Sequence, residues 1–372
     1  MNLAEPWQSA LDRWISAGLV DAATAERVRE FESSRDQPKH LRWPTLIAIA
    51  FGALMLAAGV LLLVSAHWDD MSPAQRFSLV LVMVAIFHVG GAIFSDRFSA
   101  LSTALHGVGT ASLGAGIFLS AQIFNLQEHW PGGIMLWAWG AWTGWWLKRD
   151  WVQAALVALL TPAWLASEWM DATERMRDAD QIIGGGLLLL AVTYLTAISA
   201  ERRDATRRVL AWIGGIAIIP LTFVAIPERW WGWDQHVPLN LVIVGKVLGV
   251  ALPLGLAWLL RGRGAWKNSI AAIWVLAVGL ISPDAKLTPY IWAASASLGM
   301  ITWGVYEARR ERINLGILGF GLTVLCFYFS NVMDKLGRSA SLMGLGLLFL
   351  VLGWILERTR RKLVAKVKAA RA

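Results

Sequence analysis

Long runs of apolar residues alternate along this chain with short polar segments. Such runs predict membrane-spanning helices, because a hydrocarbon core about 30 Å thick needs about 20 helical residues. Twelve spans are expected, at 45–66, 77–94, 101–124, 134–147, 151–166, 182–198, 209–226, 239–260, 269–281, 289–306, 313–332 and 341–357. The fourth, fifth and ninth are short, which leaves open a re-entrant segment or a count that differs by one or two.

The basic residues gather in every second gap between these runs. Most of the 34 Lys and Arg residues lie in the first segment, in the alternate gaps and in the tail after Glu357, whereas the 26 acidic residues divide almost evenly. Basic residues are retained on the cytoplasmic side of a membrane, and acidic residues contribute little to orientation. The sequence therefore predicts an all-α bundle of about 12 transmembrane helices with both termini in the cytoplasm.

Composition supports a membrane protein and excludes several kinds of site. Only 16% of the residues are charged and mean hydropathy is +0.52, whereas soluble domains carry about 25% charged residues. The net charge of +8 is explained by topology and by attraction to anionic headgroups, so no nucleic-acid partner is expected. The single cysteine, Cys326, excludes disulfides and cysteine-ligated metal clusters within one chain. No cofactor and no metal site are predicted.

The chain divides into three expected regions. These are an amphipathic helical hairpin at 1–43, the transmembrane bundle at 44–357 and a basic cytoplasmic tail at 358–372. In the hairpin, Gly18 is placed to end the first helix, and Asp21 or Thr24 to cap the second. The apolar face of the hairpin must then cover the membrane surface, the bundle or another copy of the chain. No cleavable signal peptide is expected, because the first apolar run begins only after about 43 residues.

Small residues recur in several of the predicted spans. Gly107, Ala111 and Ala115 share one helix face, and the run 184–186 consists of three glycines. Small residues let helix backbones approach closely in lipid, where no hydrophobic force drives helices together. These positions are predicted to be packing contacts between helices.

Lys246 is the only charged residue well inside a predicted span. Ionisable residues within a membrane mark functional sites by default, although this side chain can also extend back to the outer interface. Polar residues at the outer ends of other spans can face it, namely His67, Asp69, Asp70, Gln122, Asn125, Asn331 and Asp334. Together they are candidates for an outward-facing pocket that binds a headgroup, a sugar or a cation. The alternative is that they cap loops and interact with interfacial water.

His88 and His106 form a second candidate group. Each lies about six residues from the cytoplasmic end of its span, and the two spans are joined by a short hairpin, so the imidazoles can meet at one depth. Such a pair can relay a proton, but a metal would require further ligands, and none is evident. The simpler interpretation is an interhelical hydrogen bond.

Several motifs resemble one family of bacterial membrane proteins. They are the run 14–20, with the sequence WISAGLV, the span exit AHWD at 66–69, the segment AQIFNL at 121–126 and the segment INLG at 313–316. These motifs are similar to those of the domain-of-unknown-function family number 2157. The resemblance is densest before residue 170. It implies a multi-pass protein of the bacterial inner membrane and lends no established activity.

The leading hypothesis is a transporter or flippase-like protein with an outward-facing polar site around Lys246, Asp69 and Gln122. A second hypothesis is a membrane-embedded enzyme that acts on a lipid or lipid-linked sugar at the outer face, with Asp69, Asp70 and His67 as acid and base. A third is a non-catalytic scaffold or assembly factor whose hairpin recruits a partner. The expected partners are the lipid bilayer, anionic headgroups at the basic face and a second copy of the chain.

Overall fold

The computed structural model describes residues 11, 13–35, 51, 52, 55, 59, 62, 71–123, 129–174, 176, 179–198, 204–226, 236–281, 286–331 and single positions between 344 and 358. The chain divides into two compact units, Met1–Ser72 and Pro73–Ala372, which are considered separately.

In the first unit, a short helix ends at a glycine and is followed by helix α2 (Ala22–Arg35). Gly18 has a φ of +71°, and its N–H donates to Ile15 O at 3.0 Å. The N–H of Leu19 donates to Trp14 O. This is the left-handed helix end that glycine favours, as predicted. Asp21 caps α2, and its hydrogen bonds with the side chain and backbone of Thr24 lower the pKa of the carboxyl group.

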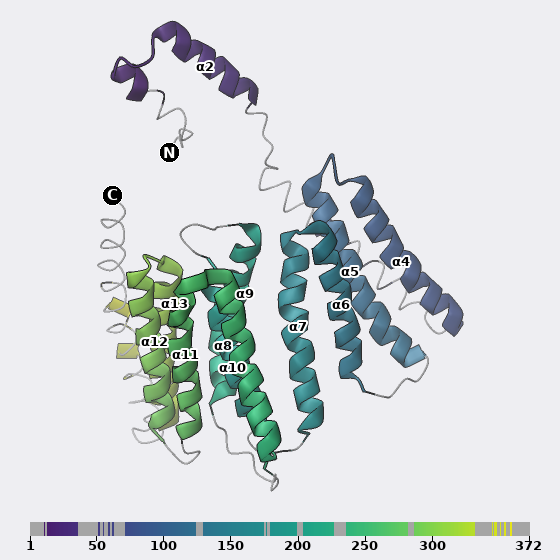
Figure 1. The fold of residues 1–372 in the computed structure, drawn as a ribbon, viewed down its shortest axis with the longest axis vertical. Helices are drawn as coiled ribbons and strands as arrows, with labels where there is room; N and C mark the ends of the chain where they lie inside the picture. Colours follow the sequence, from purple (N-terminus) through teal and green to yellow (C-terminus); the bar gives the residue numbers. More distant parts are fainter. Residues whose placement is uncertain are drawn as a thin grey trace. The chain divides into compact units, whose positions relative to one another are not determined.

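The second unit is made of helices that run alongside one another (Figure 1). In chain order they are α4 (Pro73–Ile93), α5 (Ser99–Ile123), α6 (Pro131–Lys148), α7 (Trp151–Ala172), α8 (Ala179–Leu195), α9 (Ala205–Ala225), α10 (Leu239–Arg261), the 3₁₀ helix η1 (Gly262–Ala265), α11 (Trp266–Leu276), the 3₁₀ helix η2 (Ala277–Leu280), α12 (Thr288–Tyr306) and α13 (Arg310–Asn331). Every regular element among the described residues is helical.

The described helices from α4 to α13 follow the second to eleventh predicted spans. Among the described residues, five segments are long and apolar enough to cross a membrane: Pro73–Ile93, Ser99–Gln122, Ala205–Ala225, Leu239–Gly279 and Arg310–Asn331. Helices α6 and α7 are longer than the apolar runs that predicted them, at 18 and 22 residues. Helix α6 is extended at both ends, and α7 is extended only at its C-terminal end, by residues 167–172. The first and twelfth predicted spans fall almost wholly outside the described residues, so a count of about twelve stays a prediction.

Helix α8 lies at the centre of the second half of this unit, in contact with α7, α9, α10 and α11. Its three consecutive glycines face three different neighbours, because successive helical residues point about 100° apart. A Cβ on Gly184 would lie 2.9 Å from the backbone of α9, one on Gly185 would lie 3.4 Å from Val275 of α11, and one on Gly186 would lie 3.0 Å from Gly249 Cα of α10. The glycine run therefore packs α8 against three neighbouring helices, as predicted.

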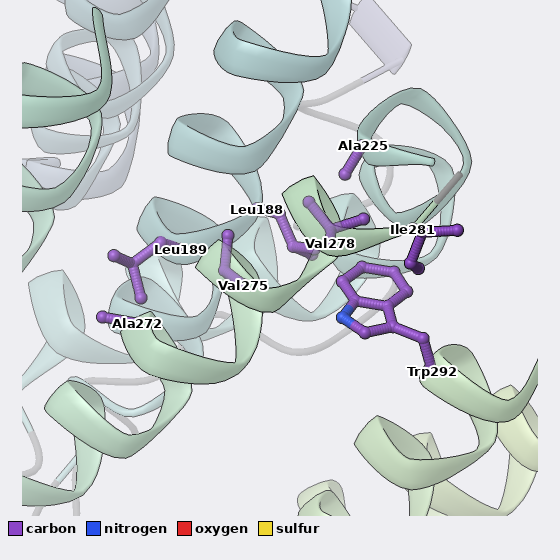
Figure 2. Packing of buried hydrophobic residues seen from close by; sticks show 8 residues of the cluster. All are labelled: Leu188, Leu189, Ala225, Ala272, Val275, Val278, Ile281 and Trp292. Atoms are coloured by element: carbon purple, nitrogen blue, oxygen red, sulfur yellow. The ribbon is translucent and has the colours of Figure 1, made fainter. Parts of the chain in front are cut away.

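Beside these glycines, α8 packs into the largest cluster of buried apolar side chains. Figure 2 shows Leu188 and Leu189 of α8 facing Ala272 and Val275 of α11, with Val278 and Ile281 beyond them. Trp292 of α12 closes the cluster, and its indole stacks on Trp274 with ring centroids 4.0 Å apart. The cluster ties α8, α9, α11 and α12 together.

A polar network joins the opposite ends of the same helices. Glu307, which follows α12, forms ion pairs with Arg261 of α10, Lys267 of α11 and Arg312 of α13. Trp303 Nε1 also donates to this carboxylate, at 2.8 Å. Burial alone raises the pKa of Glu307, but Arg312 and the donors around it outweigh burial and hold the pKa well below its usual range.

Two more arginines at this level donate to backbone carbonyls. Arg207 of α9 donates to Ala197 O at 2.8 Å and to Leu260 O at 2.6 Å, and Arg309 donates to Ile198 O at 3.3 Å. These bonds satisfy carbonyls that the ends of α8 and α10 leave without helical partners. We call this level, with Glu307, Arg207, Arg261, Lys267, Arg309 and Arg312, the basic end of the bundle.

Candidate functional site

A pocket of about 440 Å³ lies at the end of the second unit opposite the basic end. Its walls come from the start of α8, the first half of α10, the end of α11 with η2, and His236 before α10. Four of the residues that line it are glycines, namely Gly185, Gly186, Gly249 and Gly279. Gly186 and Gly249 pack against each other where α8 and α10 form the wall.

Lys246 brings a positive charge into this pocket. It lies seven positions after Leu239, the start of α10, which places its backbone about 10 Å along the helix axis. Its Nζ lies 4.0 Å from where a Cβ on Gly279 would be. Among the described residues, no carboxylate lies within ion-pair distance of Lys246. The ammonium group therefore faces the pocket without a counter-charge from this part of the chain.

The helix opposite Lys246 changes its geometry at the pocket. After Leu276 the α-helical turn tightens into η2, and Val278 O accepts both the N–H of Ile281 at 3.0 Å and the side chain of Gln181 at 3.2 Å. Irregular backbone at membrane depth is tolerated where it lines a cavity. The pocket thus combines a cation, an amide side chain and the 3₁₀ turn that ends a helix.

The other residues predicted for this site are placed as follows. Gln122 lies in the last turn of α5 with an exposed side chain, and it is not among the residues that line the Lys246 pocket. Asn331 ends α13, and its amide donates to Phe327 O at 3.4 Å. His67, Asp69, Asp70, Asn125 and Asp334 lie outside the described residues.

Sequence reasoning did not identify Gln181 or His236 as parts of this pocket. Both lie near predicted span ends, where polar residues are common, so neither carries a distinctive signal by itself. Their relation to Lys246 depends on how α8, α10 and α11 pack. The glycine run at 184–186 was the one sequence feature that marked this part of α8.

The two histidines meet in a second polar site between α4 and α5. The Nδ1 atoms of His88 and His106 lie 3.1 Å apart, and the ring centroids lie 5.4 Å apart. The two rings fit against glycines on each other's helix. A Cβ on Gly91 would lie 2.8 Å from the ring of His106, and one on Gly109 would lie 2.9 Å from the ring of His88. Each helix thus carries a His-x-x-Gly segment, and the antiparallel helices exchange the two contacts.

Residues from the next two helices extend this site. Gln153 of α7 is fully buried, and its side chain donates to His106 O at 3.1 Å and to Thr110 Oγ1 at 2.9 Å. Trp137 Nε1 of α6 donates to Thr110 O at 2.8 Å. The pair is therefore the centre of a polar contact among four helices, α4 to α7.

The contacts also indicate which imidazole donates. His106 Nε2 is buried and has no hydrogen-bond partner among the described residues. A buried N–H without an acceptor is rarer than an unsatisfied acceptor, so we assign the proton of His106 to Nδ1. His106 then donates to His88 Nδ1. This arrangement is an interhelical hydrogen bond, the simpler of the two interpretations of the pair.

This assignment predicts a coupled effect on stability. His88→Leu should destabilise the protein by about 1–3 kcal/mol, because it leaves the buried N–H of His106 without an acceptor. His88→Leu with His106→Leu should cost clearly less than the sum of the two single changes, because both polar partners are then gone. Thermal unfolding of the four proteins in detergent measures the coupling. Strictly additive effects would contradict the hydrogen bond.

Comparison with known families gives one match. Residues 12–154 match the family model described as a predicted membrane protein, DUF2157, which confirms the resemblance expected from the N-terminal motifs. The matched part contains His88 and His106, whereas the Lys246 pocket lies beyond it. No curated protein and no solved structure gives a match.

Proposed function

We propose that this membrane protein binds an anionic ligand in the pocket around Lys246 and moves it into or across the bilayer, as a transporter or flippase does. The observation that carries the proposal is the position of the Lys246 charge. It lies about 10 Å along the axis of α10 from the start of the helix, on the wall of a pocket of about 440 Å³. No described carboxylate lies beside it. Pockets for small ligands commonly measure about 300–1,000 Å³.

The charge selects among the ligand classes that the sequence left open. A cation would be repelled by Lys246, and a neutral sugar would leave the ammonium group without a counter-charge at a depth where that is costly. A ligand with a phosphate or carboxylate group would be attracted by Lys246 and would supply the missing counter-charge. Because the pocket lies opposite the basic end, the positive-inside rule assigns it to the outer face, where an anionic lipid headgroup is at hand.

A translocation assay tests this function. The full-length protein is reconstituted into vesicles that contain tail-labelled phosphatidylglycerol or phosphatidylcholine, and the rate at which label crosses the bilayer is followed by chemical quenching. Phosphatidylglycerol should cross faster than phosphatidylcholine. Lys246→Gln should lower its rate about tenfold, which corresponds to about 1.4 kcal/mol, while Lys246→Arg should keep most of it.

Lys286 offers the matched control, because it is an exposed lysine just before α12 and is not among the residues lining the pocket. Lys286→Gln removes the same charge and should leave the rate unchanged. Equal rates for the two lipids, or an unchanged rate in Lys246→Gln, would overturn the proposal.

A further inference from the structure

A second hollow lies between α11 and α12 and shares no lining residue with the Lys246 pocket. Its volume is about 510 Å³, and its lining is mostly apolar. The residues that define it are Trp266, Ile270, Trp274, Met300, Trp303 and Tyr306. We call this hollow the α11–α12 groove.

The floor of the groove is held by contacts that exist without a ligand. Trp274 stacks on Trp292 at 4.0 Å with the ring planes 9° apart, and Trp274 Nε1 donates to Ser295 Oγ at 3.0 Å. Trp292 Nε1 in turn donates to Trp274 O at 3.1 Å. The aromatic wall is therefore fixed in place, which reduces the ordering that a ligand must impose.

The rim of the groove is exposed. Ile270 is 55% exposed, Trp266 is 58% exposed and Tyr306 is 77% exposed. In a helix bundle that lies in a bilayer, such a rim faces lipid tails. A flexible apolar chain can therefore enter the groove from the side.

A cation stands at the end of the groove that meets the basic end. Lys267 lines the groove, and its Nζ lies 4.3 Å from the centroid of the Tyr306 ring. Lys267 also donates to Glu307 at 2.6 Å, but Arg261 and Arg312 bind the same carboxylate. Three cations thus share one anion, and the cluster retains positive charge beside the mouth of an apolar groove.

We infer that the α11–α12 groove holds an anionic phospholipid, with one acyl chain along the aromatic wall and the headgroup phosphate at Lys267. The apolar lining matches the acyl chain, and the surplus positive charge matches the phosphate. The basic end is the side that faces the anionic cytoplasmic leaflet under the positive-inside rule. This site is distinct from the Lys246 pocket and does not depend on the proposed transport.

Glycine positions allow a clean test of the groove. Gly299 lines it, and a Cβ there would meet nothing within 4 Å, so Gly299→Phe should fill the groove without disturbing the backbone. Gly255 of α10 is equally open but is not among the residues lining the groove. Gly255→Phe therefore adds the same side chain to a helix surface elsewhere and serves as the matched control.

The experiment uses the full-length protein with Lys246→Gln, so that the Lys246 pocket does not contribute a lipid preference. Its melting temperature is measured in detergent during titration with phosphatidylglycerol or phosphatidylcholine, and the further changes are made in this background. Phosphatidylglycerol should raise the melting temperature at lower concentration than phosphatidylcholine does. Gly299→Phe should weaken the apparent affinity for phosphatidylglycerol tenfold or more, whereas Gly255→Phe should leave it unchanged. Lys267→Met should remove the preference between the two lipids and keep the response to both.

Three results would overturn the inference. The first is an unchanged phosphatidylglycerol response in Gly299→Phe, and the second is equal responses of the Lys246→Gln protein to both lipids. The third is a dimer that Gly299→Phe dissociates on sedimentation, which would assign the groove to a second copy of the chain. A failure of lipid translocation in the Lys246 assay would leave this test unaffected.

Discussion

Glu307→Gln is expected to cost about 3–5 kcal/mol of stability, the range seen when one partner of a buried ion pair is removed. The substitution keeps the shape of the side chain but removes the carboxylate that Arg261, Lys267 and Arg312 share. The Arg312 side chain is 2% exposed and the Arg261 side chain is 8% exposed. Neither can regain the hydration that it lost on folding.

Thermal unfolding in detergent measures this effect, and Glu311 provides the control. Glu311 lies in the first turn of α13 with an exposed side chain, so Glu311→Gln removes the same charge four residues away and should change stability little. Equal melting temperatures for Glu307→Gln and the unaltered protein would contradict the role of this carboxylate.

The same carboxylate predicts a dependence on pH. The pKa of Glu307 is lowered in the folded protein, so its contribution is present above the unfolded-state pKa, near 4.5, and is lost as the pH falls below that value. Stability should therefore fall below about pH 4.5 in the unaltered protein. It should fall less steeply in Glu307→Gln.

Gly214→Ala is the second change with a large expected effect. A Cβ on Gly214 would lie 2.3 Å from Ala191 O and 2.5 Å from Leu195 N, which are backbone atoms of α8 and cannot turn aside. Helices α8 and α9 would have to separate, at a cost of about 3 kcal/mol or more, the upper end for overpacked sites. Folded yield and melting temperature should both fall sharply.

The adjacent residue supplies a matched control for this prediction. A Cβ on Gly215 would lie 3.5 Å from a Leu315 side-chain atom, which is an ordinary contact. Gly215→Ala makes the same chemical change one position along α9 and should be tolerated. Equal losses of stability at the two positions would contradict the close packing of Gly214 against α8, because alanine is the better helix former at both positions.

Much of the architecture could be predicted from the sequence, because apolar runs and glycines report directly on membrane helices and their packing. The run 184–186 indicated a close contact, and the structure shows that it contacts three helices. His88 and His106 could be paired by counting residues from one short hairpin. Both inferences needed only local geometry along the chain.

The polar clusters of the second half were harder to predict. Glu307 is near Arg309 and Arg312 in sequence, but its bonds with Arg261 and Lys267 reach back 46 and 40 residues. Such partners are set by which helices touch, and charge alternation gives only the side of the membrane. For the same reason, the sequence alone does not place Gln181 and His236 beside Lys246.

Lys246 itself was found because a charge within an apolar run is costly. The expected convergence with Gln122 has no counterpart in the lining of the pocket, because α5 packs with α4, α6 and α7, whereas α10 packs with α8 and α11. The sequence could place both residues near one face of the membrane. It could not assign them to neighbouring helices.

The central claim is that Lys246 lies in a pocket open to the outer face, and site-directed labelling tests it most directly. Lys246→Cys is placed in a Cys326→Ala background, and membrane-impermeant maleimide is added to right-side-out or inside-out vesicles. Arg263→Cys, in η1 at the basic end, is the control for the other side. We expect Lys246→Cys to react only in right-side-out vesicles and Arg263→Cys only in inside-out vesicles. Labelling of Lys246→Cys from the inside, or from neither side, would contradict the account.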